Sequence, residues 1–277
     1  MRDTEWIPQG IDRERASAAR MYDYYLGGQH HLPADVELAD RVMELLPQTP
    51  LIMRANRSFL RRAVRFCAHA GIRQFLDVGA GIPTQGPVHE VARALHPEAR
   101  VVYVDNDDAA VLHSRELLRE DQHSTAVQGD LRDVEGVLAH PDVTSLIDFE
   151  EPVALLFLSV LQFIPDRDDP YGAVAKYRDA LVPGSRLVLS HATDEGLAEQ
   201  AEEITDIYAR SENPIRYRRP EAVLRFFGDF ELCDPGLVHI PRWRPDGTDE
   251  EQVHLGRVLG AAGVGIKRSG SQDMRRT

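Results

Sequence analysis

Three aspartates stand where short apolar segments end, and their positions favour a shared binding site. Asp77, Asp105 and Asp130 each lie at or just after an apolar run of strand length. Ligands of doubly wound folds bind where the carboxyl ends of parallel strands meet, so we expect the three carboxylates to lie together. Each aspartate by itself is equally explained as the cap of a turn or a helix. Three of them at one edge favour a ligand with several hydrogen-bond donors.

A glycine turn directly follows the first aspartate. In Asp77-Val78-Gly79-Ala80-Gly81, the glycines let a ligand approach the backbone without meeting a Cβ atom. Dinucleotide-binding proteins have a similar turn, but they place glycine or alanine where this sequence has Thr84, and a carboxylate at Asp77 disfavours a pyrophosphate. S-adenosylmethionine has no phosphate, and its positively charged methionine end suits an acidic pocket. We therefore predict S-adenosylmethionine as the cofactor, with an NAD(P)-dependent oxidoreductase as the less favoured alternative.

The ends of the second and third strands provide groups for the adenosine part of this cofactor. Asp105, which precedes Asn106, is placed to accept hydrogen bonds from both ribose hydroxyls. After the third strand comes Gly129, followed by Asp130 and Leu131. We expect Asp130 to accept a hydrogen bond from the adenine amino group and Leu131 to pack on the ring.

The segment from Arg20 to Gly28 is a candidate lid. Its arginine suits the cofactor carboxylate, Tyr22 and Tyr25 are expected near the methionine part, and the glycines permit hinging. The alternative is an amphipathic helix with half-buried tyrosines. The predicted cofactor contacts are Arg20, Tyr22, Tyr25, Gly28, Asn56, Asp77, Gly79, Ala80, Gly81, Thr84, Asp105, Asn106, Gly129, Asp130, Leu131 and Ser159.

Methyl transfer needs alignment and exclusion of water more than a fixed catalytic base, so no universal catalytic residue is expected. The candidates for acid–base chemistry are Tyr22, His30 and His191, although a solvated loop is the ordinary place for such histidines. Gln162 and Phe163 are expected either to line the acceptor pocket or to begin a buried helix. No metal site is predicted, because the adjacent histidines at 30 and 31 point apart and the two cysteines lack ligand spacing.

The elements that must position these residues change near residue 71 from helices alone to alternating strands and helices. Before it, helical patterns cover 12–26, 33–46 and 50–70, and a row of arginines in the third is expected to be a solvated face: Arg54, Arg57, Arg61 and Arg65. After it, apolar strand-length runs alternate with helical stretches, which indicates a parallel sheet covered on both faces. The strands are expected at 74–78, 101–104, 126–128, 153–158, 186–190, 230–232 and 260–266.

Composition narrows the class of protein. The chain has 277 residues, 43% of them apolar, which is enough for a packed core. The net charge of −13 disfavours nucleic-acid binding, and no long uncharged apolar run predicts a membrane span. The first residues lack a signal-peptide pattern and Cys67 and Cys233 are expected to be free thiols, so a cytoplasmic location is the default expectation.

Six segments carry a resemblance to a known family: 19–28, 54–57, 74–84, 102–107, 129–133 and 190–194. In these segments the sequence resembles the actinobacterial S-adenosyl methyltransferase family, formerly a domain of unknown function. The resemblance implies a doubly wound, Rossmann-like α/β methyltransferase sheet of seven strands, the last antiparallel, with an N-terminal helical cap. We expect residues 1–70 to form the cap or lid, 71–268 the cofactor-binding domain and 269–277 a flexible tail. A small-molecule acceptor is expected because an acidic, capped protein favours a closed pocket; the alternative is a non-catalytic regulatory module that binds the cofactor or its product.

Overall fold

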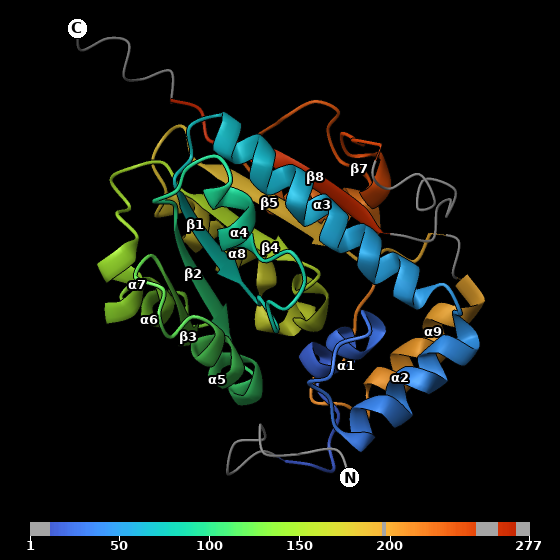
Figure 1. Cartoon of the computed structure of the whole chain (residues 1–277). Helices are drawn as coiled ribbons and strands as arrows, with labels where there is room; N and C mark the ends of the chain where they lie inside the picture. Colours follow the sequence, from blue (N-terminus) through green and yellow to red (C-terminus); the bar gives the residue numbers. More distant parts are fainter. Residues whose placement is uncertain (1–11, 196–197, 248–259, 270–277) are drawn as a thin grey trace, which may run out of the picture.

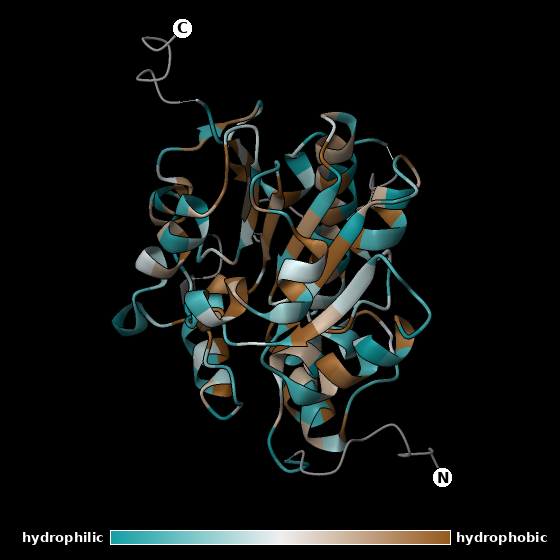
Figure 2. Cartoon of the chain, turned by 90° about the vertical axis from the view of Figure 1, so that its left-hand side faces the viewer, coloured by the Kyte–Doolittle hydropathy of each residue, from teal (hydrophilic) through white to brown (hydrophobic). Residues whose placement is uncertain are grey.

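The computed structural model describes residues 12–195, 198–247 and 260–269 (Figure 1). Apart from residue 269, the expected tail therefore lies outside the described residues. None of the helices within these ranges is long and apolar enough to cross a membrane. Figure 2 shows hydrophobic residues along the central strands and hydrophilic ones on much of the surrounding helices and loops.

The centre of the fold is one mixed sheet with the strand order β3-β2-β1-β4-β5-β8-β6. The first five strands in the chain are parallel, and β8 runs antiparallel to β5, which confirms the predicted fold class. The two-residue strands β6 and β7 pair with opposite ends of β8, so together they stand where one edge strand was expected. The strands are β1 (Gln74–Val78), β2 (Arg100–Asp105), β3 (Ser124–Gln128), β4 (Ala154–Leu158), β5 (Arg186–His191), β6 (Glu231–Leu232), β7 (Val238–His239) and β8 (Ala261–Ile266).

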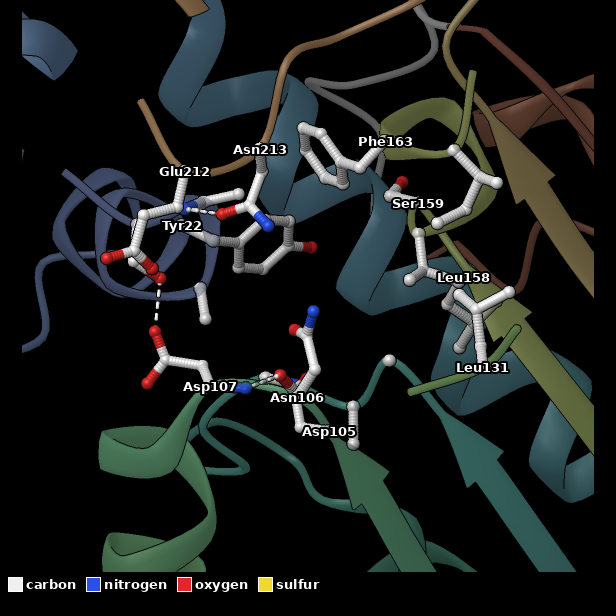
Figure 3. Close-up of a pocket in the computed structure, with 18 of the residues that line it drawn as sticks. Tyr22, Asp105, Asn106, Asp107, Leu131, Leu158, Ser159, Phe163, Glu212 and Asn213 are labelled. Atoms are coloured by element: carbon white, nitrogen blue, oxygen red, sulfur yellow. Dashed lines mark hydrogen bonds between the residues drawn. The ribbon is translucent and has the colours of Figure 1, made fainter. Parts of the chain in front are cut away.

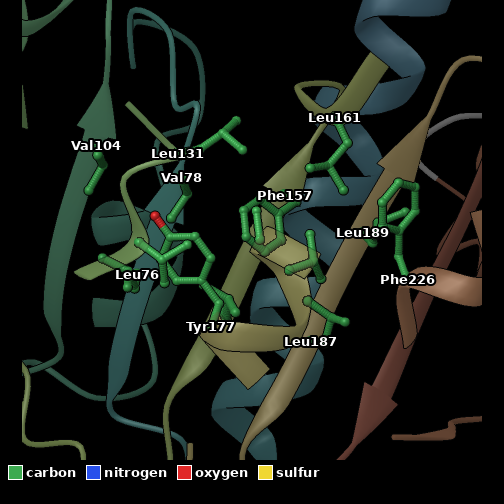
Figure 4. Close-up of a cluster of buried hydrophobic side chains, with 14 of the residues drawn as sticks. Leu76, Val78, Val104, Leu131, Phe157, Leu161, Tyr177, Leu187, Leu189 and Phe226 are labelled. Atoms are coloured by element: carbon green, nitrogen blue, oxygen red, sulfur yellow. The ribbon is translucent and has the colours of Figure 1, made fainter. Parts of the chain in front are cut away.

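Alternate residues of the central strands enter separate apolar clusters on the two faces of the sheet. Leu76 and Val78 belong to one cluster, drawn in Figure 4, in which Tyr177 of α8 (Pro170–Asp179) meets Phe157 edge-on, with 5.4 Å between ring centroids. Phe75 belongs to the other cluster, which is covered by α3 (Thr49–His69). Because the central strands β1, β2, β4 and β5 contribute apolar residues to both clusters, the middle of the sheet is buried between helices, as the continuous apolar runs predict.

The remaining helices differ in detail from the sequence pattern. Residues 134–146 form two short helices, because the backbone turns at His140, whose side chain accepts a hydrogen bond from Asp142 N, and Pro141 then fits the first turn of the second. The helix expected from Asp12 begins only at Ala18. The helices are α4 (Val88–Arg93), α5 (Asp108–Leu117), α6 (Val134–Leu138), α7 (Pro141–Leu146) and α10 (Pro220–Leu224).

A separate helical layer lies beside the carboxyl ends of the parallel strands (Figure 1). It consists of α1 (Ala18–Tyr25), α2 (Pro33–Leu45) and α9 (Ala198–Tyr208), which share a third apolar cluster. Most of α3 packs on the sheet instead, whereas α9, from the last third of the chain, packs on α2. Residues distant in sequence from α1 and α2 therefore contribute to this helical layer.

Candidate active site

A cavity of about 360 Å³ lies at the carboxyl ends of β1 to β4 and is covered from the other side by α1 (Figure 3). This size falls in the range of small-molecule and cofactor sites. The predicted contacts that line it are Tyr22, Asn56, Asp77, Gly79, Ala80, Gly81, Asp105, Asn106, Gly129, Asp130, Leu131 and Ser159. The three aspartates and the glycine turn thus meet at one edge of the sheet.

The turn after β1 requires glycine at Gly79 for two reasons. Its φ of +75° is a conformation that residues with a side chain rarely adopt. A Cβ atom there would also lie 2.1 Å from a methyl group of Val160. The amide nitrogens of Gly79 and Ala80 both donate to the carbonyl of Val104, at 2.7 and 3.1 Å, which fixes the turn to the neighbouring strand.

Asp77 carries a buried carboxylate oxygen without a protein partner. The residue is 3% exposed, and its Oδ1 atom has no hydrogen bond within the described residues. Burial raises the pKa of Asp77 to about 7, with Arg57 acting in the opposite direction and Asp105 raising it further. A buried acceptor that is left unpaired destabilises the protein, so this position suits a ligand that brings a cation or an N–H donor.

Asp105 is held in place by two backbone amides. Its Oδ2 atom accepts from Gly81 N at 2.7 Å and its Oδ1 atom accepts from Asp107 N at 2.9 Å. Burial raises the pKa of Asp105 to about 6, although these hydrogen bonds lower it. Each carboxylate oxygen can accept a second hydrogen bond, so the orientation is compatible with a pair of hydroxyl donors.

Asp130 differs from the other two because it already has a cationic partner. Arg132 Nε lies 2.9 and 3.0 Å from its two carboxylate oxygens, and Arg132 Nη1 continues to Asp168 at 3.0 Å. The hydrogen bonds from Arg132 hold the pKa of Asp130 below its usual value. Asp130 still lines the cavity beside Leu131, but its charge is neutralised within the chain.

A chain of polar side chains connects α1 to the ends of β4 and β5. The Tyr22 hydroxyl donates to Met53 O at 3.2 Å and accepts from Asn56 Nδ2 at 3.0 Å. Asn56 Oδ1 accepts from Ser190 Oγ at 2.7 Å, and Ser190 Oγ accepts from Ser159 N at 3.1 Å. Burial raises the pKa of Tyr22, so its hydroxyl is a neutral donor and acceptor at neutral pH.

Comparison with known proteins decides the family. A model of the S-adenosyl methyltransferase family matches residues 4–268. The chain belongs to this family. It is therefore an S-adenosylmethionine-dependent methyltransferase, as the sequence resemblance predicted.

Solved structures support the same assignment. A crystal structure of a DUF574 family protein from Streptomyces avermitilis is 37% identical, with a TM-score of 0.88 over 92% of this chain and 99% of that one. A Thermobifida fusca protein is 40% identical, with a TM-score of 0.86 over 95% and 99%. The plantazolicin methyltransferase BpumL bound to SAH shares only the fold, with 10% identity and a TM-score of 0.52 over 91% and 95%. No curated protein sequence matches the chain.

Arg20 of this methyltransferase does not line the cavity, in contrast to the prediction. Its Nε atom binds Asp35 at 2.8 Å, Nη1 binds Asp107 at 3.3 Å and Nη2 donates to Arg15 O at 2.8 Å. Arg20 is 1% exposed, and its guanidinium joins α1 to α2 and to Asp107, which caps α5. Each of these hydrogen bonds is made to a group of the chain itself.

Three further predicted contacts also lie outside this cavity. Gly28 packs on Asp23, where a Cβ atom would lie 2.1 Å from the carboxylate, and Thr84 Oγ1 donates to the same aspartate at 3.2 Å. Tyr25 is buried in the helical cap and lines a second cavity. These residues shape the segment that covers the site, because Asp23 fixes the turn after α1, but they do not form the cofactor cavity itself.

The two histidine candidates are not placed for acid–base chemistry. His191 is fully buried, with Nδ1 2.7 Å from Ala192 O and Nε2 2.9 Å from Arg218 Nη1. Burial lowers its pKa to about 3, so the ring stays neutral and accepts from the guanidinium. His30 donates its backbone N–H to Asp23 and lies outside the cavity. Within the described residues no cluster of histidine, cysteine and acidic side chains could hold a metal ion.

Sequence reasoning missed the role of Arg57. Its helical spacing with the other arginines predicted a solvated face, but Arg57 is 9% exposed and lines the cavity. Its Nε and Nη2 atoms donate to Gln85 O at 3.0 and 2.7 Å, so the guanidinium is fixed against the segment after the glycine turn. Its charge lowers the pKa of Asp77. The available signal was its place in the family-like segment 54–57, which the arginine periodicity obscured.

The segment that precedes α1 forms the remaining wall of the cavity (Figure 3). Ser17 Oγ donates to Asp107, and Ala18 N donates to the side-chain oxygen of Asn213 at 3.0 Å. Arg15 donates to Ser211 O at 3.0 Å. These hydrogen bonds hold residues 15–18 against residues 211–213. The two segments together cover the cavity on the side opposite the strands.

Proposed function

We propose that this methyltransferase modifies a small-molecule acceptor by in-line transfer within the cavity that α1 covers. The observation that carries the proposal is the unpartnered Asp77 Oδ1 atom beside the glycine turn, which fits the ammonium group of S-adenosylmethionine. The cofactor supplies a methyl group on a positively charged sulfur atom. The chain supplies alignment and a site from which the cap excludes water.

The cavity residues have complementary charges for the parts of this cofactor. We assign the ammonium group to Asp77, the carboxylate to Arg57 and the ribose hydroxyls to Asp105, because each is fixed by burial or hydrogen bonds at the cavity wall. Leu131 and Asp130 are assigned to the adenine ring. The Tyr22 hydroxyl, held by Asn56 and Met53, orients the reacting groups as a neutral phenol and does not remove a proton.

A small acceptor is favoured over a macromolecule by the covered site and the charge. The cavity lies under the α1 segment, whose contacts with Ser211 and Asn213 close it. A net charge of −13 also opposes binding of a phosphate backbone.

The test is transfer of a labelled methyl group into an extract that is then separated by mass. Label in the low-mass filtrate, absent with Asp105→Ala, supports the proposal. Label confined to acid-precipitated protein or nucleic acid contradicts the small-molecule acceptor. SAH binding without any transfer across extracts from many sources would favour a non-catalytic binding module.

A further inference from the structure

A second cavity of about 80 Å³ adjoins the first and extends into the helical cap. The two share the lining residues Ala18, Tyr22, Ser159 and Phe163. Figure 3 shows the Tyr22 hydroxyl directed toward the side on which Phe163 and Ser159 lie. A molecule in the second cavity, which we name the cap chamber, would therefore present its reacting end at the shared wall of the cofactor cavity.

The cap chamber differs sharply from the cofactor cavity in the chemistry of its walls. The cofactor cavity contains aspartates and arginines, whereas none of the described side chains that line the chamber is an acid, a base or a histidine. Its walls come from α1, α2, α3 and α9, from the segments that follow β4, β5 and α9, and from the residue that precedes β8. Lining residues that it does not share with the cofactor cavity include Tyr25, Ile52, Thr193, Tyr208 and Tyr217.

The polar side chains of the chamber are hydroxyls and the amide of Gln162, whose Oε1 atom accepts from Ala192 N at 3.0 Å. Thr193 is 2% exposed, and its Oγ1 atom has no hydrogen-bond partner among the described residues. Tyr25, Tyr208 and Tyr217 also line the chamber, and burial raises the pKa of each, so all three stay neutral. A buried hydroxyl without a partner destabilises the fold, and a ligand with one hydrogen-bonding group would satisfy it.

We propose that the cap chamber binds the methyl acceptor, and that the acceptor is a neutral, mainly apolar aromatic molecule methylated on a hydroxyl group. This inference rests on the proposed function. A carboxylate, phosphate or ammonium acceptor would lose its hydration without gaining a countercharge, which is costly in an apolar site. An aromatic ring matches the apolar and tyrosine walls, and its hydroxyl finds neutral donors and acceptors.

The transfer step is balanced with this acceptor and with the groups present. A lone pair of the acceptor oxygen forms the new bond to the methyl carbon, and the carbon–sulfur bond breaks with its electron pair remaining on sulfur. The hydroxyl proton leaves to water. No described side chain of the chamber takes that proton, so the reaction favours acceptors whose hydroxyl is acidic.

Binding of three single-ring probes to the SAH-saturated protein tests the proposal. The probes are 4-ethylphenol, 4-ethylbenzoate and 4-ethylbenzylamine, which have similar size and are neutral, anionic and cationic at pH 7. We expect 4-ethylphenol to bind at least tenfold more tightly than either charged probe, measured by ligand-observed NMR titration. Equal or tighter binding of a charged probe, or no measurable binding of 4-ethylphenol, would overturn the proposal.

A pair of tryptophan variants localises the binding. Ile52→Trp places a large ring in the chamber and should weaken 4-ethylphenol at least tenfold, while SAH binding changes less than twofold because Ile52 does not line the cofactor cavity. Leu112→Trp, at a residue of α5 that is 46% exposed, is the matched control and should change neither. Unchanged 4-ethylphenol binding in a folded Ile52→Trp protein would refute the chamber as its site. If the wild-type protein does not bind SAH, this result would instead contradict the proposed function.

Discussion

Replacing Asp77 by asparagine should stabilise the protein without ligand at pH 8 and weaken its binding of SAH. The carboxyl group has a pKa of about 7 in the folded chain against its ordinary value of 3.8, chiefly because it is buried. The folded state therefore binds this proton more tightly than the unfolded state does. It follows that stability falls as pH rises between about 4 and 7 and that the loss persists at pH 8.

The magnitude follows from the two pKa values. At about 1.4 kcal/mol for each pKa unit, the ionised Asp77 destabilises the folded chain by at most about 4 kcal/mol at pH 8. Asparagine keeps the size and one oxygen but removes the charge. For a chain of this size we expect the melting temperature of Asp77→Asn at pH 8 to rise by at least about 3 °C, and to change little at pH 4.

Ligand binding should respond in the opposite direction. SAH carries the ammonium group that we assign to Asp77, so the variant should bind it at least tenfold more weakly at pH 8, which is about 1.4 kcal/mol. In the wild-type protein, affinity should fall about tenfold from pH 8 to pH 6 as Asp77 takes up its proton. Asp77→Asn should show only the smaller change that Asp105, with a pKa of about 6, produces.

Differential scanning fluorimetry and calorimetry at pH 4, 6 and 8 measure both effects. Asp179→Asn, at an exposed position of α8, is the matched control and should leave melting temperature and SAH affinity unchanged. A melting temperature of Asp77→Asn at pH 8 equal to or below that of the wild type would refute the burial argument. Unaltered SAH affinity would refute the assignment of Asp77 to the ammonium group.

Three other changes have defined outcomes. Asp105→Ala should weaken SAH at least tenfold by calorimetry, about 1.4 kcal/mol, and an unchanged affinity would remove Asp105 from the site. Trp243→Ala should lower the free energy of unfolding in urea by about 3–5 kcal/mol, because the fully buried ring packs edge-on against Phe59 at 5.3 Å; a loss under 1 kcal/mol would contradict this. Tyr22→Phe leaves the buried amide of Asn56 without its acceptor and should cost about 1–3 kcal/mol in the same assay, with methyl transfer reduced; wild-type stability and rate would show that the hydroxyl is dispensable.

The sequence predicted the parts of the site that depend on local pattern. Asp77, Asp105 and Asp130 were found because each ends an apolar run, and the sheet geometry then requires them to share an edge. The glycine turn was found because Gly79 and Gly81 adopt conformations that few other residues can. These features require only strand period and turn chemistry.

The parts that the sequence did not predict depend on partners far along the chain. Arg20 was expected at the cofactor, but Asp35 and Asp107, 15 and 87 residues away, bind its guanidinium. His191 was predicted as a catalytic candidate, but the guanidinium of Arg218, 27 residues later in the chain, lies against its ring. Whether an arginine or a histidine faces a ligand or a buried partner is decided by tertiary packing, which helical or strand period does not encode.

The distribution of charge explains why the two cavities can perform separate tasks. Asp77 and Asp105 both have raised pKa values, and the buried cation Arg57 lowers that of Asp77, so a ligand that carries positive charge restores the balance only in the cofactor cavity. Among the described residues, no charged side chain lines the cap chamber. A cationic or anionic acceptor would therefore find no countercharge there. A charged acceptor would therefore be drawn toward the cofactor residues and would compete with the cofactor for them. A neutral acceptor avoids this competition, which allows both molecules to occupy the adjoining cavities at once and to meet at Tyr22 and Ser159.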